Sequence, residues 1–314
     1  MSNPIKTVGV CGAGGTMGAG IAIVAARAGF RTISFDMSMD ALDRAAGQTE
    51  GFFGKSVERG KMGAEDRDAI LGRMSRTTDM ADLAECDLVI EAVFEDLKIK
   101  QDLLGKLDTI CPEHTIFASN TSTLSITEIA SGCSRQDRVV GMHFCLPAQL
   151  MKLIEMSPGV NTDPAIFQTA WDWTLAAVQH PVETQDKPGF ILNALLVPFN
   201  NDAIRAVEAG VASPADIDKA IAYGPGMRWA LMGPHLTYHL GGGAGGYRHY
   251  LDHLGPTQEA RWRELGETPL SEALKDRLVA GVEAELAGQD EATLTQRRDA
   301  ALVALAGLKA RFGL

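Results

Sequence analysis

The stretch Thr7-Val8-Gly9-Val10-Cys11-Gly12-Ala13-Gly14-Gly15-Thr16-Met17-Gly18 decides the fold of the first half of the chain. A short apolar run passes directly into a glycine-rich turn, and an alanine-rich helical segment follows as far as Ala28 and stops at Gly29. In this order of strand, turn and helix, the helix N-terminus offers N–H groups and positive potential to a phosphate. The loop predicted to bind the pyrophosphate of a dinucleotide consists of Gly12, Gly14, Gly15, Thr16, Met17 and Gly18. Its glycine spacing is one residue longer than the usual G-x-G-x-x-G pattern.

The next apolar run, Thr32–Phe35, ends at an acid, Asp36, which lies 18 residues after Gly18. At such a position a carboxylate accepts hydrogen bonds from the 2′-hydroxyl of the adenosine ribose. A 2′-phosphate would be repelled there, and the two residues that follow, Met37 and Ser38, supply no arginine to receive it. The sequence therefore predicts NAD rather than NADP as the cofactor. A helix cap is the alternative role for Asp36.

The first half alternates between apolar runs, which include Leu88–Ala92 and Val139–Met142, and segments with helical spacing. Such alternation is typical of a parallel sheet with helices on its faces. One polar helical stretch, residues 41–74, interrupts it and predicts an inserted helical hairpin. After the turn-like Lys187-Pro188-Gly189, the segments are all helical. We therefore predict an α/β fold with two domains, a Rossmann-type domain over residues 1–186 and an all-α domain over residues 187–314.

Composition excludes several classes of protein. Among 314 residues, 40 acidic side chains face 29 basic ones, and this negative balance disfavours nucleic acid and anionic membranes as partners. No apolar run is long enough to span a bilayer, and the N-terminus does not resemble a signal peptide. The five cysteines are scattered and odd in number, which fits reduced thiols. We therefore expect a cytoplasmic protein.

Five further motifs carry a resemblance to a known family. They are Glu91-Ala92-Val93-Phe94-Glu95, Ser119-Asn120-Thr121-Ser122-Thr123-Leu124-Ser125-Ile126, Gly141-Met142-His143-Phe144, Met151-Lys152-Leu153-Ile154-Glu155 and Pro188-Gly189-Phe190-Ile191-Leu192-Asn193. With these motifs, in this order and spacing, the chain resembles the 3-hydroxyacyl-CoA dehydrogenase family over nearly its whole length. The resemblance implies an NAD-dependent enzyme that oxidises a 3-hydroxyacyl compound to its 3-oxo form.

The resemblance assigns the chemistry to four residues. His143 and Glu155, twelve residues apart, match the family's catalytic pair. An imidazole titrates near the working pH and can take the proton of a hydroxyl group, and a carboxylate on its other nitrogen fixes the tautomer. Ser122 and Asn193 match the two remaining polar residues of the active site, where they hold the substrate.

The resemblance also assigns Glu95, Lys100 and Asn120 to the cofactor. One departure concerns the segment after His143, where the family has an asparagine near the nicotinamide ribose and this chain has Leu146. That contact is therefore absent. Cys145 lies two residues from His143, and we interpret it as a buried thiol rather than a nucleophile.

Two substrate classes stay open. Lys55 and Arg59, one helical turn apart in the hairpin, match basic residues that meet the CoA moiety in short-chain members of the family. The second half is more similar to carnitine dehydrogenases and lambda-crystallin, and there Arg228 could make a two-pronged bond to a free carboxylate. A short-chain 3-hydroxyacyl-CoA is the first choice, a free 3-hydroxy acid such as carnitine or gulonate is the alternative, and a non-catalytic NAD-binding protein is a third. The relatives also imply a homodimer, and we expect no metal.

Overall fold

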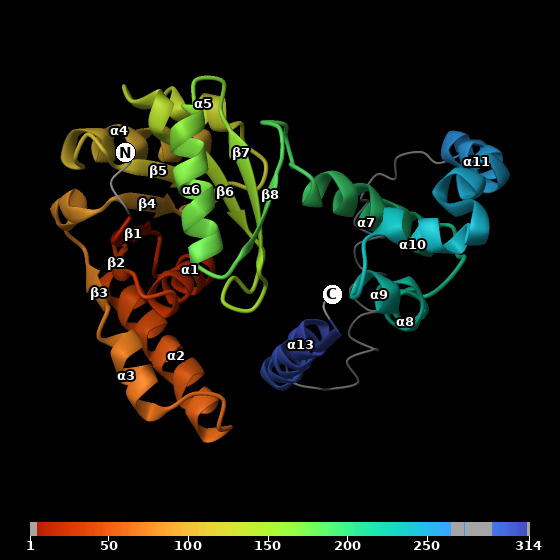
Figure 1. Ribbon diagram of the computed structural model, residues 1–314, viewed down its shortest axis with the longest axis horizontal. Helices are drawn as coiled ribbons and strands as arrows, with labels where there is room; N and C mark the ends of the chain where they lie inside the picture. Colours follow the sequence, from red (N-terminus) through yellow and green to blue (C-terminus); the bar gives the residue numbers. More distant parts are fainter. Residues whose placement is uncertain (1–4, 265–272, 274–290, 313–314) are drawn as a thin grey trace. The chain divides into compact units, whose positions relative to one another are not determined.

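The computed structural model describes residues 5–264, 273 and 291–312 (Figure 1). The chain forms two compact units, Met1–Ala194 and Leu195–Leu314. These units are compact bodies and do not test the domain boundary predicted after residue 186, which stays a prediction.

One eight-stranded sheet forms the centre of the first unit, with the strand order β3-β2-β1-β4-β5-β6-β7-β8. Neighbouring strands are parallel except β6 and β7, which are antiparallel. The strands are β1 (Thr7–Cys11), β2 (Arg31–Phe35), β3 (Met74–Thr77), β4 (Leu88–Glu91), β5 (Ile116–Ser119), β6 (Val139–Phe144), β7 (Leu153–Pro158) and β8 (His180–Glu183). The direction of winding reverses between β1 and β4, and such a switch point opens a ligand crevice at the carboxyl ends of the strands.

Helices cover both faces of the sheet. On one face, Val8 and Val10 of β1 share a core with α1 (Thr16–Arg27) and α6 (Pro164–Ala176). On the other face, Val89 of β4 packs with α4 (Leu97–Ile110) and α5 (Ile126–Ala130). Because both faces are covered, β1, β4, β5 and β6 are buried along their whole length. Buried parallel strands have nearly continuous apolar sequences, so their positions are evident from the sequence.

The predicted helical hairpin consists of α2 (Met39–Glu58) and α3 (Ala64–Leu71), which Figure 1 shows projecting from the sheet. Ser38 caps α2, since its hydroxyl accepts a hydrogen bond from the N–H of Ala41. Phe53 is fully buried and anchors α2 on α1 and α3. The Rossmann-type domain with an inserted hairpin is confirmed.

Three strands of the sheet, β3, β7 and β8, are not predicted from the sequence. The β3 sequence, Met-Ser-Arg-Thr, has exposed polar residues at its centre, because it forms one edge of the sheet. The β8 sequence, His-Pro-Val-Glu, contains a proline and forms the other edge, where proline is tolerated. Strand β7 makes the sheet mixed, since it runs antiparallel to β6. The residues that the structure describes also include three short 3₁₀ helices: η1 (Met80–Glu85), η2 (Gln136–Arg138) and η3 (Gly243–Gly245).

Within its described residues the second unit is helical, as predicted. The helices are α7 (Leu192–Glu208), which starts in the first unit, α8 (Pro214–Tyr223), α9 (Pro225–Trp229), α10 (Pro234–Gly241), α11 (Gly246–Glu264) and α13 (Glu291–Phe312). Helix α8 begins with Ser213 as its cap and Pro214 at its first position, where a proline is well tolerated. In the described part of the chain we find no helix that is long and apolar enough to cross a membrane.

Candidate active site

The predicted nucleotide loop lies between β1 and α1. Gly12 has a φ of +78°, a left-handed conformation that favours glycine. A Cβ on Gly18 would lie 2.3 Å from the carbonyl oxygen of Gly12, and a Cβ on Gly14 would lie 2.6 Å from the Cβ of Ala41. Gly12 is therefore required by its backbone conformation, and Gly14 and Gly18 are required by space. The extra residue is accommodated at Gly15, which precedes α1 with an ordinary φ of −87°.

Asp36 follows the end of β2 and faces this loop. One carboxylate oxygen, Oδ2, accepts a hydrogen bond from the N–H of Gly14 at 3.0 Å. The other, Oδ1, accepts from the N–H of Ser38 at 3.2 Å. The helix cap of α2 is Ser38 rather than Asp36, so the capping alternative does not describe this carboxylate. Backbone N–H groups at the start of α1, three required glycines and an acid beside the loop fit a bound dinucleotide.

His143 and Glu155 lie directly opposite each other on the antiparallel strands β6 and β7. The distance from Nδ1 of His143 to Oε2 of Glu155 is 2.7 Å. The antiparallel pairing of two strands thus explains why residues twelve apart in the sequence meet. With Nδ1–H donated to the carboxylate, Nε2 of His143 carries a lone pair and can accept a proton.

Glu155 also holds the first residues of α7. Its second oxygen, Oε1, accepts hydrogen bonds from the N–H groups of Ile191 and Leu192, each at 2.8 Å. Burial alone would raise the pKa of Glu155, but the hydrogen bonds from His143 and from these two N–H groups outweigh it, and the pKa is lowered. The carboxylate therefore stays ionised beside His143.

The tight turn before α7 brings those two N–H groups to Glu155. Gly189 has a φ of +81° and Phe190 a φ of +48°. A left-handed conformation costs a residue with a side chain about 1–2 kcal/mol. Burial of the Phe190 ring, whose centroid lies 5.9 Å from that of the His143 ring, offsets this cost.

Ser122 and Asn193 complete a ring of hydrogen bonds. The Ser122 hydroxyl lies 3.1 Å from Nε2 of His143. The Asn193 amide donates to the carbonyl oxygen of Ser122, also at 3.1 Å. The ring therefore runs from Ser122 through His143 and Glu155 to the start of α7 and returns through Asn193. All four predicted catalytic residues meet in the first unit.

The three residues assigned to the cofactor by resemblance have partners within the protein. Asn120 accepts a hydrogen bond from the N–H of Phe144 at 2.8 Å. Glu95 receives hydrogen bonds from the loop that carries Ser122. Lys100 is 1% exposed and lies 2.9 Å from the carboxylate of Glu91. Burial raises the pKa of Glu91, and the Lys100 ammonium limits that rise. This ion pair is not predicted from the sequence, although Glu91 opens the motif Glu91-Ala92-Val93-Phe94-Glu95.

The remaining predicted residues take no part in the hydrogen bonds of the ring. Lys55 and Arg59 are exposed at the C-terminal end of α2, and Arg228 is exposed on α9 of the second unit. Leu146 is 60% exposed, and burial raises the pKa of the Cys145 thiol to about 11, with Glu155 adding to the rise. A neutral thiol agrees with a role for Cys145 in packing rather than as a nucleophile. Among the described residues, no group of three histidine, cysteine or acidic side chains could hold a metal ion.

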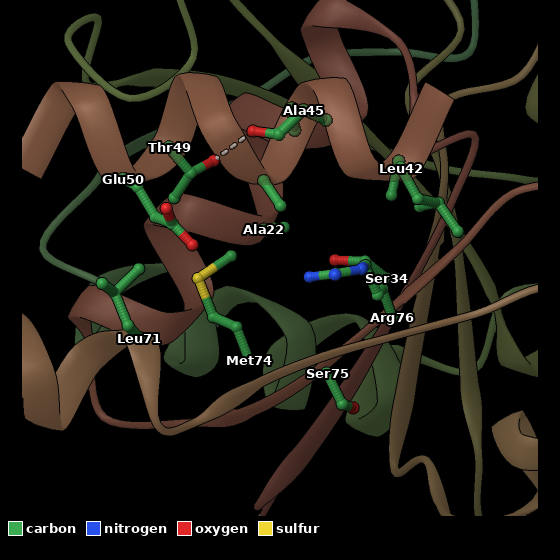
Figure 2. A pocket seen from close by; sticks show the side chains of 13 residues that line it. Ala22, Ser34, Leu42, Ala45, Thr49, Glu50, Leu71, Met74, Ser75 and Arg76 are labelled. Carbon is green, nitrogen blue, oxygen red and sulfur yellow. Dashed lines mark hydrogen bonds between the residues drawn. The ribbon is translucent and has the colours of Figure 1, made fainter. Parts of the chain in front are cut away.

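A cavity of about 130 Å³ lies between the sheet, α1 and the hairpin (Figure 2). It is lined by small and apolar side chains, together with Thr49, Glu50 and Arg76. The Thr49 hydroxyl is bonded to the carbonyl oxygen of Ala45, and Arg76 is paired with Asp43 at 2.8 Å. None of the predicted catalytic residues lines it.

The fold and the ring together define a dinucleotide-dependent dehydrogenase. A family model described as 3-hydroxyacyl-CoA dehydrogenase, NAD binding domain, matches residues 7–187, and the model of the family's C-terminal domain matches residues 189–276. The chain belongs to the 3-hydroxyacyl-CoA dehydrogenase family, as its motifs predicted, and is an NAD-dependent oxidoreductase.

Individual relatives differ in how much of the chain they match. Human mitochondrial hydroxyacyl-coenzyme A dehydrogenase is 42% identical over 236 residues, which cover 73% of this chain and 74% of that protein. L-carnitine dehydrogenase of Nocardiopsis dassonvillei is 35% identical over 303 residues, which cover 96% of this chain and 91% of that protein. The solved 3-hydroxybutyryl-CoA dehydrogenase of Escherichia coli K12 has a TM-score of 0.67 and 41% identity over 70% of this chain. The chain spans about half the length of that last protein, 46%.

Proposed function

We propose that the protein oxidises a short-chain 3-hydroxyacyl-CoA to the 3-oxoacyl-CoA. The observation that carries this proposal is the hydrogen-bonded ring around His143, in which an ionised Glu155 leaves Nε2 free to act as a base. Bound NAD supplies the acceptor for the hydride that leaves C3 of the substrate. His143 takes the proton of the 3-hydroxyl group at Nε2, so that the alcohol becomes a ketone. Glu155, 2.7 Å from Nδ1, stabilises the imidazolium that results.

Ser122 and Asn193 hold the substrate in this mechanism. The Ser122 hydroxyl lies beside Nε2 and reaches the same oxygen atom from which the proton leaves. Asn193 already uses one amide hydrogen on Ser122, so its second amide hydrogen is available for the thioester carbonyl. Fixing both oxygens brings C3 into a reactive position.

The assay that tests the proposal is a panel of 3-hydroxy acids and their CoA thioesters, scored by formation of NADH. Turnover of a short-chain thioester at least tenfold more efficient than that of the free acids supports it. If the protein turns over none of the 3-hydroxy compounds, the proposal is contradicted and the non-catalytic alternative remains.

The exposed cations of the hairpin support CoA as the recognised group. Lys55 and Arg59 lie one turn apart, and charge-assisted bonds to phosphates contribute about 1–3 kcal/mol each when partly shielded. We expect the double variant Lys55→Ala, Arg59→Ala to raise the KM for a thioester at least tenfold. The same variant should leave a free acid within threefold, since a small substrate need not reach the hairpin.

A second candidate, a dehydrogenase of a free 3-hydroxy acid, is favoured by one observation. The carnitine dehydrogenase match covers 96% of this chain, whereas the human CoA-dependent match covers 73%. In this case Arg228 binds the substrate carboxylate. Arg228→Leu should then abolish binding, and Arg228→Lys should restore little, because lysine lacks the planar pair of donors. A critical Arg228 together with a neutral hairpin variant would favour this candidate over the first.

We further propose that the protein is a homodimer formed through its helical unit. Among the side chains of the second unit that the structure describes, Val207 is the only buried large apolar one, while Leu195, Leu196 and Val197 are more than half exposed. Consecutive exposed apolar side chains of this kind are typical of an interface. Sedimentation equilibrium should give twice the chain mass of 33.5 kDa, and the mass of one chain would contradict the proposal.

We also propose a reducing compartment, the cytoplasm. All five cysteines are free thiols in the structure, and the pKa of the buried Cys11 is raised well above its ordinary value by burial and by Glu91. Such thiols are stable without a disulfide partner where glutathione keeps them reduced. Localisation of a fluorescent fusion tests this directly.

A further inference from the structure

The loop that carries Ser122 is held at both ends by carboxylates from outside it. It connects β5, which ends at Ser119, to α5, which begins at Ile126. Glu95 binds its first part and Asp186 binds its end. The loop has no helix or strand of its own, and these two carboxylates accept most of the hydrogen bonds that its donors make to side chains outside it.

Four hydrogen bonds converge on a single oxygen of Glu95. Oε1 accepts from the hydroxyl of Thr121 at 2.7 Å and from the N–H of Ser122 at 2.8 Å. It also accepts from the N–H and the hydroxyl of Thr123, at 2.9 Å and 3.0 Å. The Ser122 backbone is therefore fixed at its own nitrogen and at both neighbours.

The other oxygen of Glu95 meets a buried cation. Oε2 lies 3.4 Å from Nζ of Lys100, and that ammonium is in turn bonded to both oxygens of Glu91, at 3.0 Å and 2.9 Å. Glu91 also accepts a hydrogen bond from the Ser119 hydroxyl at the end of β5. A buried ammonium between two carboxylates cannot turn outward without leaving a charge unpaired, so Lys100 anchors Glu95 rigidly.

We infer that Glu95 is a positioning residue for Ser122: it holds the serine hydroxyl on Nε2 of His143, and the buried pair of Lys100 and Glu91 keeps Glu95 in place. Burial alone would raise the pKa of Glu95, but its hydrogen bonds and Lys100 outweigh it, and the pKa is lowered, so the acceptor stays ionised. This role differs from the cofactor contact that the resemblance assigns to Glu95 and Lys100.

The inference rests on the proposed dehydrogenase activity only through the turnover assay. Asp186 offers a matched control, because it also accepts four hydrogen bonds from this segment: from the Ser125 hydroxyl, from the N–H groups of Ile126 and Thr127, and from the Thr127 hydroxyl. None of these donors belongs to Ser122 or its two neighbours. Glu95→Gln and Asp186→Asn therefore remove the same charge from the two ends of one loop.

For Glu95→Gln we expect kcat to fall about 10- to 100-fold, because a small displacement of a positioned group costs that much. The KM and the dissociation constant for NAD should stay within threefold of the parent. For Asp186→Asn, kcat should stay within threefold while the melting temperature falls. Two results overturn the inference: a tenfold weaker NAD affinity for Glu95→Gln with unchanged kcat at saturation, which indicates a cofactor ligand, or equal losses of kcat in both variants.

Two further measurements test this inference if the proposed activity is wrong or if the Glu95 variant does not fold. With histidines labelled with ¹⁵N, the Nε2 resonance of His143 should move in Glu95→Gln and remain in place in Asp186→Asn, whether or not any substrate is turned over. If Glu95→Gln does not fold, Thr123→Val removes one of the four donors at an exposed position. That variant should lower kcat about three- to tenfold, and an unchanged kcat would overturn the inference.

Discussion

At the carboxyl end of β1 the nucleotide loop is built from backbone, whereas at the ends of β5, β6 and β7 the catalytic corner is built from side chains. In the loop, Gly12 and Gly18 approach so closely that a single added carbon has no room. In the corner, His143 and Glu155 are fixed by the direction of hydrogen bonds. Steric space therefore limits which residues the loop can contain, whereas hydrogen-bond geometry limits which residues the catalytic corner can contain. Substitutions in the two regions should consequently change different measured quantities.

The largest effect is expected in the catalytic corner. His143→Ala removes the base and should lower kcat by about two to four orders of magnitude, the usual contribution of general acid–base catalysis. The dissociation constant for NAD, measured by fluorescence titration, should remain within threefold, because the loop does not depend on the imidazole. A variant within threefold of the parent kcat would show that the proton goes elsewhere.

Gly18→Ala tests the loop and should have the opposite result: NAD affinity falls and kcat is kept. Its Cβ would lie 2.3 Å from the Gly12 carbonyl oxygen, which is backbone and cannot move aside. We expect the free energy of unfolding to fall by about 1–3 kcal/mol, as in other overpacked sites. NAD affinity should fall about tenfold or more, equivalent to about 1.4 kcal/mol, while kcat at saturating NAD stays close to that of the parent.

Gly15→Ala is the control for that variant. Gly15 has an ordinary φ, and an added Cβ would come no closer than 3.3 Å to the Gly12 oxygen. NAD affinity should change less than threefold. If both alanine variants weaken NAD equally, space is not what limits the loop, and the contrast between the two regions fails.

The cofactor preference tests the acid beside the loop rather than the glycines of the loop. Because Asp36 lies beside the loop without a neighbouring arginine, NAD should be preferred over NADP by at least tenfold in kcat/KM, about 1.4 kcal/mol. Asp36→Ser should narrow this ratio, since the repulsion of a 2′-phosphate is removed. Equal use of the two cofactors by the parent would contradict the role of Asp36.

The backbone-built region was the easier one to predict. Gly12, Gly14 and Gly18 leave a pattern in the sequence because each excludes a side chain, and β1 and β4 are visible because both their faces are buried. By contrast, the polar edge strand β3 gives no such signal, because one side of an edge strand faces solvent.

The corner could be predicted only by resemblance to a family. Nothing in the spacing of His143 and Glu155 reveals that they pair across antiparallel strands, because β7 was not expected as a strand. The N–H groups of Ile191 and Leu192 leave no signal, since any residue other than proline supplies one. Lys100 carries a charge on a helix that also exposes Lys98, and the sequence alone does not distinguish the buried lysine from the exposed one.

The bonds from Ile191 and Leu192 to Glu155 have a consequence for recombining this chain with its relatives. The two family models meet at residues 187 and 189, a natural place to join halves of different proteins. A junction there would take the donors of Glu155 from a foreign segment, whereas a junction after Ala194 keeps them with their own acceptor. Chimeras joined after Ala194 should therefore inherit an intact base from the parent of the first half, and those joined at residue 188 must rebuild it.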